Sequence, residues 1–242
     1  MAVTKTDIIA QLQKDILPLQ GYKSSLHDHA LDVGLGPITQ AFPNKKFPLG
    51  AVHEFFCTCA EDAVVASGFV AGILSSLMKT NGVTLWISSS AIIFPPALKA
   101  FGIDPEKIIF VDLKKEKEIL WAIEEALKCN SLAAVVGEIN EISFTESRRF
   151  QLAVEGSGVT SFILRRNPRN LTTACITRWH ITSLSSQSKD DLPGVGYPRW
   201  NVELMKVRNG QMGSWQIEWR DGRFRSAYKA ALIAVESQRK TG

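Results

Sequence analysis

Residues 50–74, GAVHEFFCTCAEDAVVASGFVAGIL, have the pattern of a strand, a short loop and a helix, and a loop in that position is where many proteins bind phosphate. Phosphate is bound there by the backbone N–H groups of glycines, by a lysine and by a Ser/Thr hydroxyl that holds Mg²⁺. The turn CTCAEDAVV has no glycine and no lysine, and the carboxylates of Glu61 and Asp62 repel phosphate. An acidic pair in the first turn of a helix complements the helix dipole by itself. We therefore predict a loop that has lost nucleotide binding.

The cysteines and histidines do not form a pattern that binds a metal. Of the four cysteines only Cys57 and Cys59 lie close together, and no second pair completes a zinc site. A disulfide across a Cys-x-Cys tripeptide is strained, so small buried thiols are the simpler interpretation. His27 and His29 stand among turn residues with no further ligand at a suitable spacing. The sequence predicts no metal and no other cofactor.

Length and composition are those of a folded chain with one large domain, alone or with small appendages. The chain has 242 residues, is 45% hydrophobic and 21% charged, and contains 12 Phe and 6 Trp, which excludes a disordered protein. A net charge of +4 is compatible with a polyanionic partner but too small to indicate one. The first 15 residues lack the features of a signal peptide, and no run of about 18 apolar residues occurs. We expect a cytoplasmic protein without membrane contact.

Apolar runs alternate with helical patterns through most of the chain. Strands are expected at 51–56, 83–88, 107–113, 131–139 and 159–165, and helices at 62–78, 95–101, 116–128 and 145–156. This alternation predicts an α/β fold with a mostly parallel sheet and helices on both faces. Beyond Arg166 apolar and polar residues alternate, which predicts antiparallel strands that include a hairpin around the turn RNGQMGS.

The two ends of the chain carry amphipathic patterns. Helices are expected over 6–19 and 226–238, with apolar residues on one face of each: Ile8, Ile9, Leu12 and Ile16 in the first, and Tyr228, Leu232 and Val235 in the second. Docking on a partner or a neighbouring subunit is one interpretation, and packing on the protein's own core or a frayed tail is the other. We divide the chain into an N-terminal helix and connector over 1–46, a core over 47–224, and a C-terminal helix and tail over 225–242.

The order of the segments over residues 34–224 resembles the core of the RecA-type ATPases. FPLGAVHEFF resembles the turn-rich entry to their first strand and phosphate loop, and PPALKAFGIDPEKIIFVDL resembles the helix, turn and strand that follow the second strand. LAAVVGEI stands in place of their Walker B strand, RRFQLAVEGSGVTSFIL resembles the next helix and strand, and VELMKVRNGQMGSWQIEW resembles their closing hairpin. The resemblance implies a RecA-like core.

The resemblance also locates the family's catalytic positions, and this chain departs from each of them. The corresponding residues are Ala63 and Val64 for the phosphate-loop lysine and hydroxyl, Gly137 (next to Glu138) for the Walker B acid, Ser88, Ser89 and Ser90 for the catalytic glutamate, and Arg165 for the polar sensor. Losses at four separate positions imply a degenerate nucleotide site and no ATP hydrolysis.

A RecA-like chain of this size with a degenerate site resembles the ImuA family, and FPLGAVHEFF and RNGQMGSWQIEW are the stretches that most suggest it. That family belongs to a bacterial mutagenesis cassette induced by DNA damage, together with ImuB, an inactive relative of the Y-family polymerases, and an error-prone DNA polymerase. The resemblance implies a non-catalytic adaptor in translesion synthesis whose partners are ImuB and the polymerase, with RecA, DNA and a second copy of the chain as further candidates.

Two alternatives stay open. SulA, an inhibitor of cell division, is a more distant and usually shorter relative with a similar inactive core, and that interpretation makes FtsZ the partner. An active ATPase with an unusual loop is the other, although the missing lysine and hydroxyl speak against it.

Basic residues follow two of the predicted strands and form the candidate contacts with DNA or an acidic partner: Arg148, Arg149, Arg165, Arg166 and Arg169. Arg165 and Arg166 are the strongest candidates, because open α/β sheets place their sites at the carboxyl ends of the strands. The alternative is a solvated surface, since the loops are short and lack aromatic residues for stacking on bases.

Overall fold

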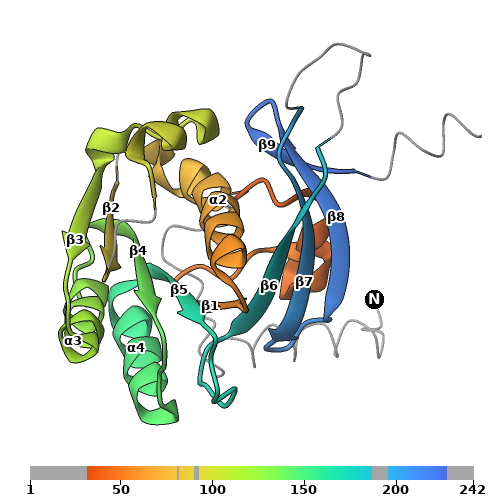
Figure 1. Cartoon of the computed structure of the whole chain (residues 1–242). Helices are drawn as coiled ribbons and strands as arrows, with labels where there is room; N and C mark the ends of the chain where they lie inside the picture. The colour runs from red at the N-terminus through yellow and green to blue at the C-terminus, as the bar shows by residue number, and fades with distance from the viewer. Residues whose placement is uncertain (1–31, 81, 90–92, 187–195, 228–242) are drawn as a thin grey trace, which may run out of the picture.

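The computed structural model describes residues 32–80, 82–89, 93–186 and 196–227, and these form one α/β unit around a single sheet (Figure 1). In the described residues the sheet has nine strands in the order β3-β2-β4-β5-β1-β6-β7-β8-β9. The strands are β1 (Val52–Cys57), β2 (Val83–Ser88), β3 (Ile108–Asp112), β4 (Leu132–Ile139), β5 (Thr160–Arg166), β6 (Thr177–Leu184), β7 (Arg199–Val207), β8 (Gly213–Arg220) and β9 (Arg223–Ser226).

In the part of the chain that the structure describes, the parallel strands are connected by the α-helices α2 (Ala60–Leu77), α3 (Glu116–Leu127) and α4 (Phe144–Ser157). The other helical segments in the described residues are short 3-10 helices: Gly36–Ala41, Pro43–Lys45, Met78–Thr80, Pro95–Phe101 and Pro105–Lys107. The helix expected over 95–101 is therefore a 3-10 helix. It begins at two prolines and ends at Gly102, whose φ of 76° stops further helix formation.

Six neighbouring strands are parallel, from β3 at one edge to β6, and β7, β8 and β9 continue the sheet in antiparallel fashion. This confirms the predicted α/β class, the mostly parallel sheet and the C-terminal antiparallel hairpin. β1 lies near the middle of the sheet, with β5 on one side and β6 on the other. The loop that follows β1 is therefore positioned by strands on both sides.

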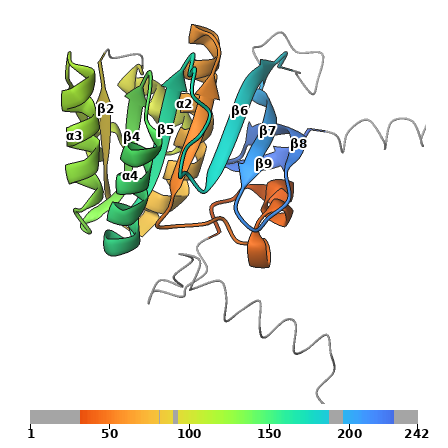
Figure 2. The ribbon, with the colours of Figure 1, turned by 90° about the horizontal axis from the view of Figure 1, so that it is seen from below.

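Helices cover the two faces of the sheet unequally. α2 packs on one face in a large apolar core, whereas α3 and α4 lie side by side on the other face and enclose a second core (Figures 1 and 2). α2 is apolar on most sides because β strands surround it as well: a Cβ on its Gly72 would come within 2.4 Å of the Phe224 ring from β9. By length and composition α2 could cross a membrane, but most of it is buried inside the protein as a core helix.

Local signals explain where α4 begins and ends. Ser143 accepts a hydrogen bond from the backbone of Glu146, and the Glu146 carboxylate accepts from the backbone of Ser143, which together form a capping box. Gly158 ends the helix with a φ of 80°. The bounds expected from the sequence differ from those of α4 by one residue at each end.

Two features of the C-terminal half differ from the prediction. β6, which was expected among the antiparallel strands after Arg166, pairs in parallel with β1, and an extended strap, residues 167–176, makes the crossover from β5. The chain also adds a ninth strand, so Ser226, which was expected to begin a helix, ends β9. The direction of a strand depends on partners far along the chain, and a strand of four residues is too short for its periodic pattern to be recognised.

Candidate functional site

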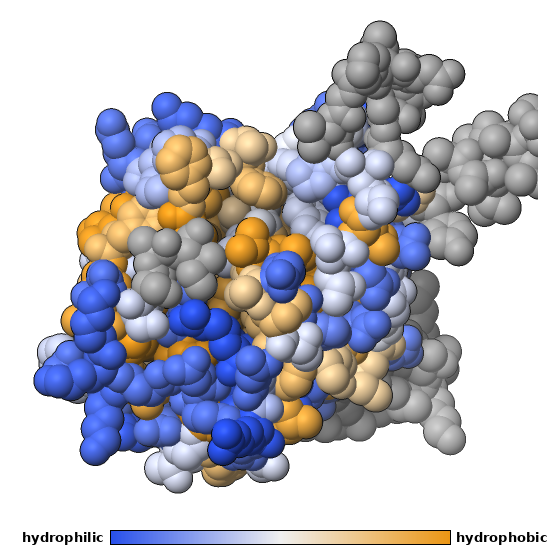
Figure 3. Space-filling model, viewed as in Figure 1, coloured by the Kyte–Doolittle hydropathy of each residue, from blue (hydrophilic) through white to orange (hydrophobic). Residues whose placement is uncertain are grey.

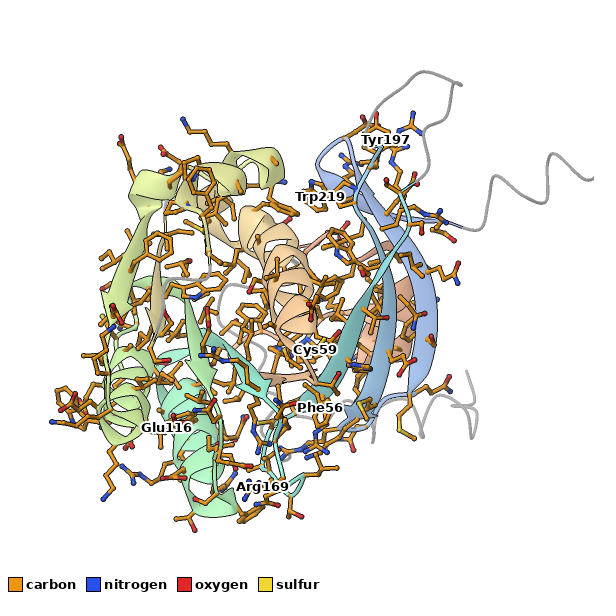
Figure 4. The ribbon with its side chains drawn as sticks, viewed as in Figure 1. Phe56, Cys59, Glu116, Arg169, Tyr197 and Trp219 are labelled. Carbon is orange, nitrogen blue, oxygen red and sulfur yellow. The ribbon has the colours of Figure 1, made fainter. Side chains whose placement is uncertain are left out.

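The candidate site lies at the carboxyl end of β1, where α2 begins. Only Thr58 and Cys59 separate the two elements, and Cys59 is an N-cap with extended backbone and no side-chain capping bond. Figure 4 shows Phe56 and Cys59 at this end of β1, beside the first turn of α2. A loop of two residues is too short to surround a phosphate with backbone N–H groups, for which nucleotide-binding proteins use a longer glycine-rich turn.

The carboxylate of Asp62 binds the loop between β1 and α2. It accepts hydrogen bonds from the backbone N–H of Thr58 at 2.9 Å and from the Thr58 hydroxyl at 2.5 Å. Burial raises the pKa of Asp62, but the two bonds from Thr58 lower it, with the result that the pKa lies below its usual value. The loop amide is thus satisfied by an ionised side chain of the same chain.

His180 of β6 extends this cluster toward β7. Its Nε2 lies 3.5 Å from a carboxylate oxygen of Asp62, and its Nδ1 lies 3.7 Å from a carboxylate oxygen of Glu203. The imidazole therefore connects the start of α2 with two strands of the sheet. The contact between Asp62 and His180 joins residues more than a hundred positions apart, so the local sequence did not reveal it.

The other residues of the loop have separate environments. Glu61 is exposed, whereas Asp62 is buried, so the two acids do not form one acidic surface. Ala63 is buried in the core and Val64 is 56% exposed. The position assigned to the phosphate-loop lysine therefore faces the interior, and the position assigned to the hydroxyl faces solvent.

The strand β4 places an acid on the same side of the sheet as α2, but one residue later than the resemblance assigned it. A Cβ on Gly137 would lie 2.3 Å from Ile123 of α3, so that position faces the opposite side. Glu138 is buried and accepts a 2.9 Å hydrogen bond from the indole N–H of Trp86, which belongs to the core around α2. Of the two residues, Glu138 is the one on the side where a metal-binding acid would be needed.

A guanidinium accompanies this acid. Burial raises the pKa of Glu138, and the indole of Trp86 and the positive charge of Arg166 offset only part of that effect. Arg166 ends β5 and donates to the hydroxyl of Ser89 at 3.2 Å. The buried carboxyl group of Glu138 therefore lies in the field of a fixed cation.

A buried network of charges holds the strap against the sheet. Glu54, in the middle of β1, is fully buried and binds Arg165 of β5, Arg178 of β6 at 2.9 Å, and the Thr173 hydroxyl at 2.8 Å. Arg165 also donates to the carbonyl oxygen of Asn170 at 2.8 Å. A glutamate inside the apolar run AVHEFF was the available sequence signal, because buried carboxylates need partners.

Further contacts fix both ends of the strap. Asn167 donates its backbone N–H to Cys57 at the carboxyl end of β1, and Ile176 donates to Val52 at the amino end. The strap therefore spans the length of β1. Lys206 of β7 donates to the carbonyl oxygen of Thr173 at 2.8 Å, and burial lowers the pKa of this lysine.

The five candidate arginines do not share one environment. Arg165 is fully buried between Glu54 and Glu141, so it cannot reach a DNA backbone. The prediction that Arg165 is one of the two strongest candidate contacts is therefore wrong. An arginine near a strand end can turn inward when carboxylates pair with it. Arg166 is partly buried. Arg148 and Arg149 are exposed on α4, near Glu155 and Glu124 respectively.

Among the five candidates, Arg169 is exposed and, within the described residues, forms no ion pair like those of Arg148 and Arg149. It is exposed on the strap (Figure 4), and its backbone N–H donates to Glu141 at 2.6 Å. Glu141 is itself held in place, because Glu116 at the start of α3 accepts from the backbone of Asn140 and Glu141 at 2.7 Å and 3.3 Å. The guanidinium of Arg169 is thus presented from a well-anchored backbone.

The cysteines divide evenly between core and surface. Cys57 and Cys175 are buried, as expected, and burial raises the pKa of each thiol to about 12. Cys59 and Cys129 are exposed, so the expectation that all four cysteines are core residues is wrong. All four are free. Within the described residues no group of three or more His, Cys, Asp or Glu side chains could hold a metal ion.

Some predicted residues lie outside the described part of the chain. These are the two histidines, His27 and His29, and the apolar faces proposed for the terminal helices: Ile8, Ile9, Leu12, Ile16, Tyr228, Leu232 and Val235.

Comparison with known proteins finds close similarity to a protein of Caulobacter vibrioides. Protein ImuA of strain NA1000 / CB15N is 32% identical to this chain over 201 residues, which cover 78% of this chain and 82% of that protein. Protein ImuA of strain ATCC 19089 / CIP 103742 / CB 15 gives the same values. No protein-family model matches the chain.

Proposed function

The chain belongs to the ImuA family, and from this premise we propose that it is a non-catalytic adaptor with a RecA-like core in SOS-induced, error-prone translesion DNA synthesis. It acts by binding an ImuB-like protein together with an error-prone DNA polymerase, RecA or DNA. It neither binds nor hydrolyses ATP.

The observation that carries this proposal is the charge arrangement at the carboxyl end of β1. The ionised Asp62 carboxylate satisfies the loop amide of Thr58, and Arg166 provides positive charge beside Glu138. Asp62 thus supplies the negative charge that a phosphate would bring, and Arg166 supplies the positive charge that a Mg²⁺ ion would bring. A bound nucleotide would have to displace Asp62 and place its phosphates against that carboxylate, which is unfavourable in a partly desolvated site.

The RecA-like assignment has support from the position of this loop. β1 is flanked by parallel strands, α2 follows it directly, and its carboxyl end lies at the edge where open α/β sheets place their ligands. A strand, a turn and a helix in this order support a domain related to phosphate-binding folds, whereas the turn is shortened and the residues that contact phosphate are replaced.

Titration with a fluorescent ATP analogue in the presence of Mg²⁺ tests the absence of nucleotide binding. We expect no saturable signal and no release of phosphate, whereas an active RecA protein assayed in parallel gives both. Saturable binding with turnover would overturn the proposal in favour of an active ATPase.

Binding to candidate partners tests the adaptor role. Immobilised protein is expected to retain an ImuB-like protein of the same organism and not FtsZ. Loss of the interaction in an Arg169→Glu variant, with Glu118→Lys on α3 as a matched charge-reversal control, would locate the contact on the strap. Retention of FtsZ without ImuB would point instead to an inhibitor of cell division.

A further inference from the structure

The two outer strands of the sheet differ in a way that concerns association. β9 has four residues and exposes Arg223 and Arg225, and charges of this kind discourage pairing with another chain. β3 has one charged residue, Asp112, at its end, and exposes Ile109 by 51% and Phe110 by 42%. Figure 3 shows hydrophobic residues gathered at the side of the molecule where β3 lies.

The exposed side chains of β3 lie on both faces of the sheet. Phe110 is beside Trp86 of β2, which faces α2, whereas Ile109 is beside Leu85, which packs in the core under α3. Among the described residues β2 is the only strand that pairs with β3. The free side of β3 thus combines unpaired backbone groups with apolar side chains above and below, which makes it a template for a further strand.

We propose that β3 pairs with β3 of a second copy of this chain. The two strands run antiparallel about a two-fold axis through Phe110 and join two sheets into one. This contact is isologous, so it closes as a dimer and does not continue into a fibre.

The sequence of β3 is complementary to itself in this register. An antiparallel pair centred on residue 110 puts Phe110 opposite Phe110 of the other copy and Ile109 opposite Val111, which gives apolar pairs on both faces. Beyond the strand end, Lys114 is already paired with Asp112 of its own chain at 2.9 Å, so the apolar pairs carry the contact. The match of these apolar side chains on both faces favours a second copy over an unrelated strand.

Analytical ultracentrifugation tests the dimer. The wild-type chain is expected to sediment as a dimer, and Phe110→Lys, which puts two ammonium groups opposite each other on the axis, to raise the dissociation constant by about a hundredfold or more. Met212→Lys is the matched control, because Met212 is 70% exposed in the turn between β7 and β8. Thermal unfolding of each variant confirms that it is folded.

Chemical cross-linking tests the register. Phe110→Cys is made in a Cys59→Ser, Cys129→Ser background, which leaves only buried native thiols in the described residues. A short bismaleimide is expected to link residue 110 to itself, and not to link Trp121→Cys on the outer side of α3. A monomeric wild-type chain, or a dimer that Phe110→Lys does not weaken and residue 110 does not cross-link, would overturn the proposal.

Discussion

Replacing Glu54 by glutamine is expected to destabilise the protein by about 3–5 kcal/mol. The side chains of Glu54 and Arg165 are both fully buried, and that of Arg178 is 11% exposed. Removing the single carboxylate that these two guanidinium groups share leaves only the half-exposed Glu141 beside Arg165, so positive charge stays in the interior with less compensation. Arg165 is the more sensitive of the two, since its Nε already lacks a hydrogen-bond partner.

Urea unfolding of the wild type and the Glu54→Gln variant measures this effect as a shift of the midpoint at constant slope. Glu118→Gln on α3 is the control, because its 2.9 Å ion pair with Lys115 is exposed and contributes less than about 1 kcal/mol. Because the network is buried, high salt should change the loss little. A loss below about 1 kcal/mol would show that the arginines find other partners or water.

The same substitution connects stability with the proposed function. Glu54 binds Thr173 of the strap directly, and Arg165 binds the carbonyl oxygen of Asn170. The strap has no regular secondary structure of its own, so its position depends on these side-chain contacts. If Arg169 contacts a partner, Glu54→Gln should weaken that contact without changing any exposed residue.

Much of the fold was predictable because apolar runs and helical periodicity are local properties. VTLWIS and LAAVVGEI are continuous apolar runs of strand length, and both form parallel strands with helices on either face. The amphipathic pattern over 116–128 became α3, because burying one face of a helix on a sheet needs no information from distant residues.

The site was less predictable because it depends on which face each residue occupies and on partners far along the chain. The resemblance assigned the Walker B acid to the position of Gly137, but the side-chain alternation of β4 puts Glu138, and not residue 137, on the side of α2. Arg165 ends the strand expected over 159–165, which suggested an exposed cation, yet its partner Glu54 lies 111 positions earlier. Only the pairing of β1 with β5 brings these two residues together.

A second large effect is expected from His53, which should make the protein lose stability in mild acid. The imidazole is fully buried in β1, stacked on Phe47 at 4.3 Å. Trp179 donates to the Thr177 hydroxyl at 2.7 Å, that hydroxyl donates to Nδ1 of His53 at 2.8 Å, and Nε2–H donates to the carbonyl oxygen of Pro48 at 2.8 Å. This chain of bonds fits a neutral imidazole, and a second proton on Nδ1 would face the hydroxyl hydrogen.

Burial lowers the pKa of His53 from 6.5 to about 3, although the bond to Pro48 opposes the shift. Below pH 6.5 the unfolded chain therefore binds a proton that the folded chain does not, and the free energy of unfolding falls by about 1.4 kcal/mol for each pH unit. At pH 5 the loss from this residue is about 2 kcal/mol, and above pH 6.5 its contribution is constant.

Comparison with His53→Gln isolates this contribution, because the other histidines and the carboxylates are the same in both proteins. The variant starts from a lower stability at pH 7.5, since glutamine does not reproduce both imidazole bonds. Its stability should nevertheless fall less steeply than that of the wild type between pH 6.5 and 5, so that the two curves converge. Parallel curves over this range would show that His53 takes up its proton in the folded state, and that its neutral form is not required by the core.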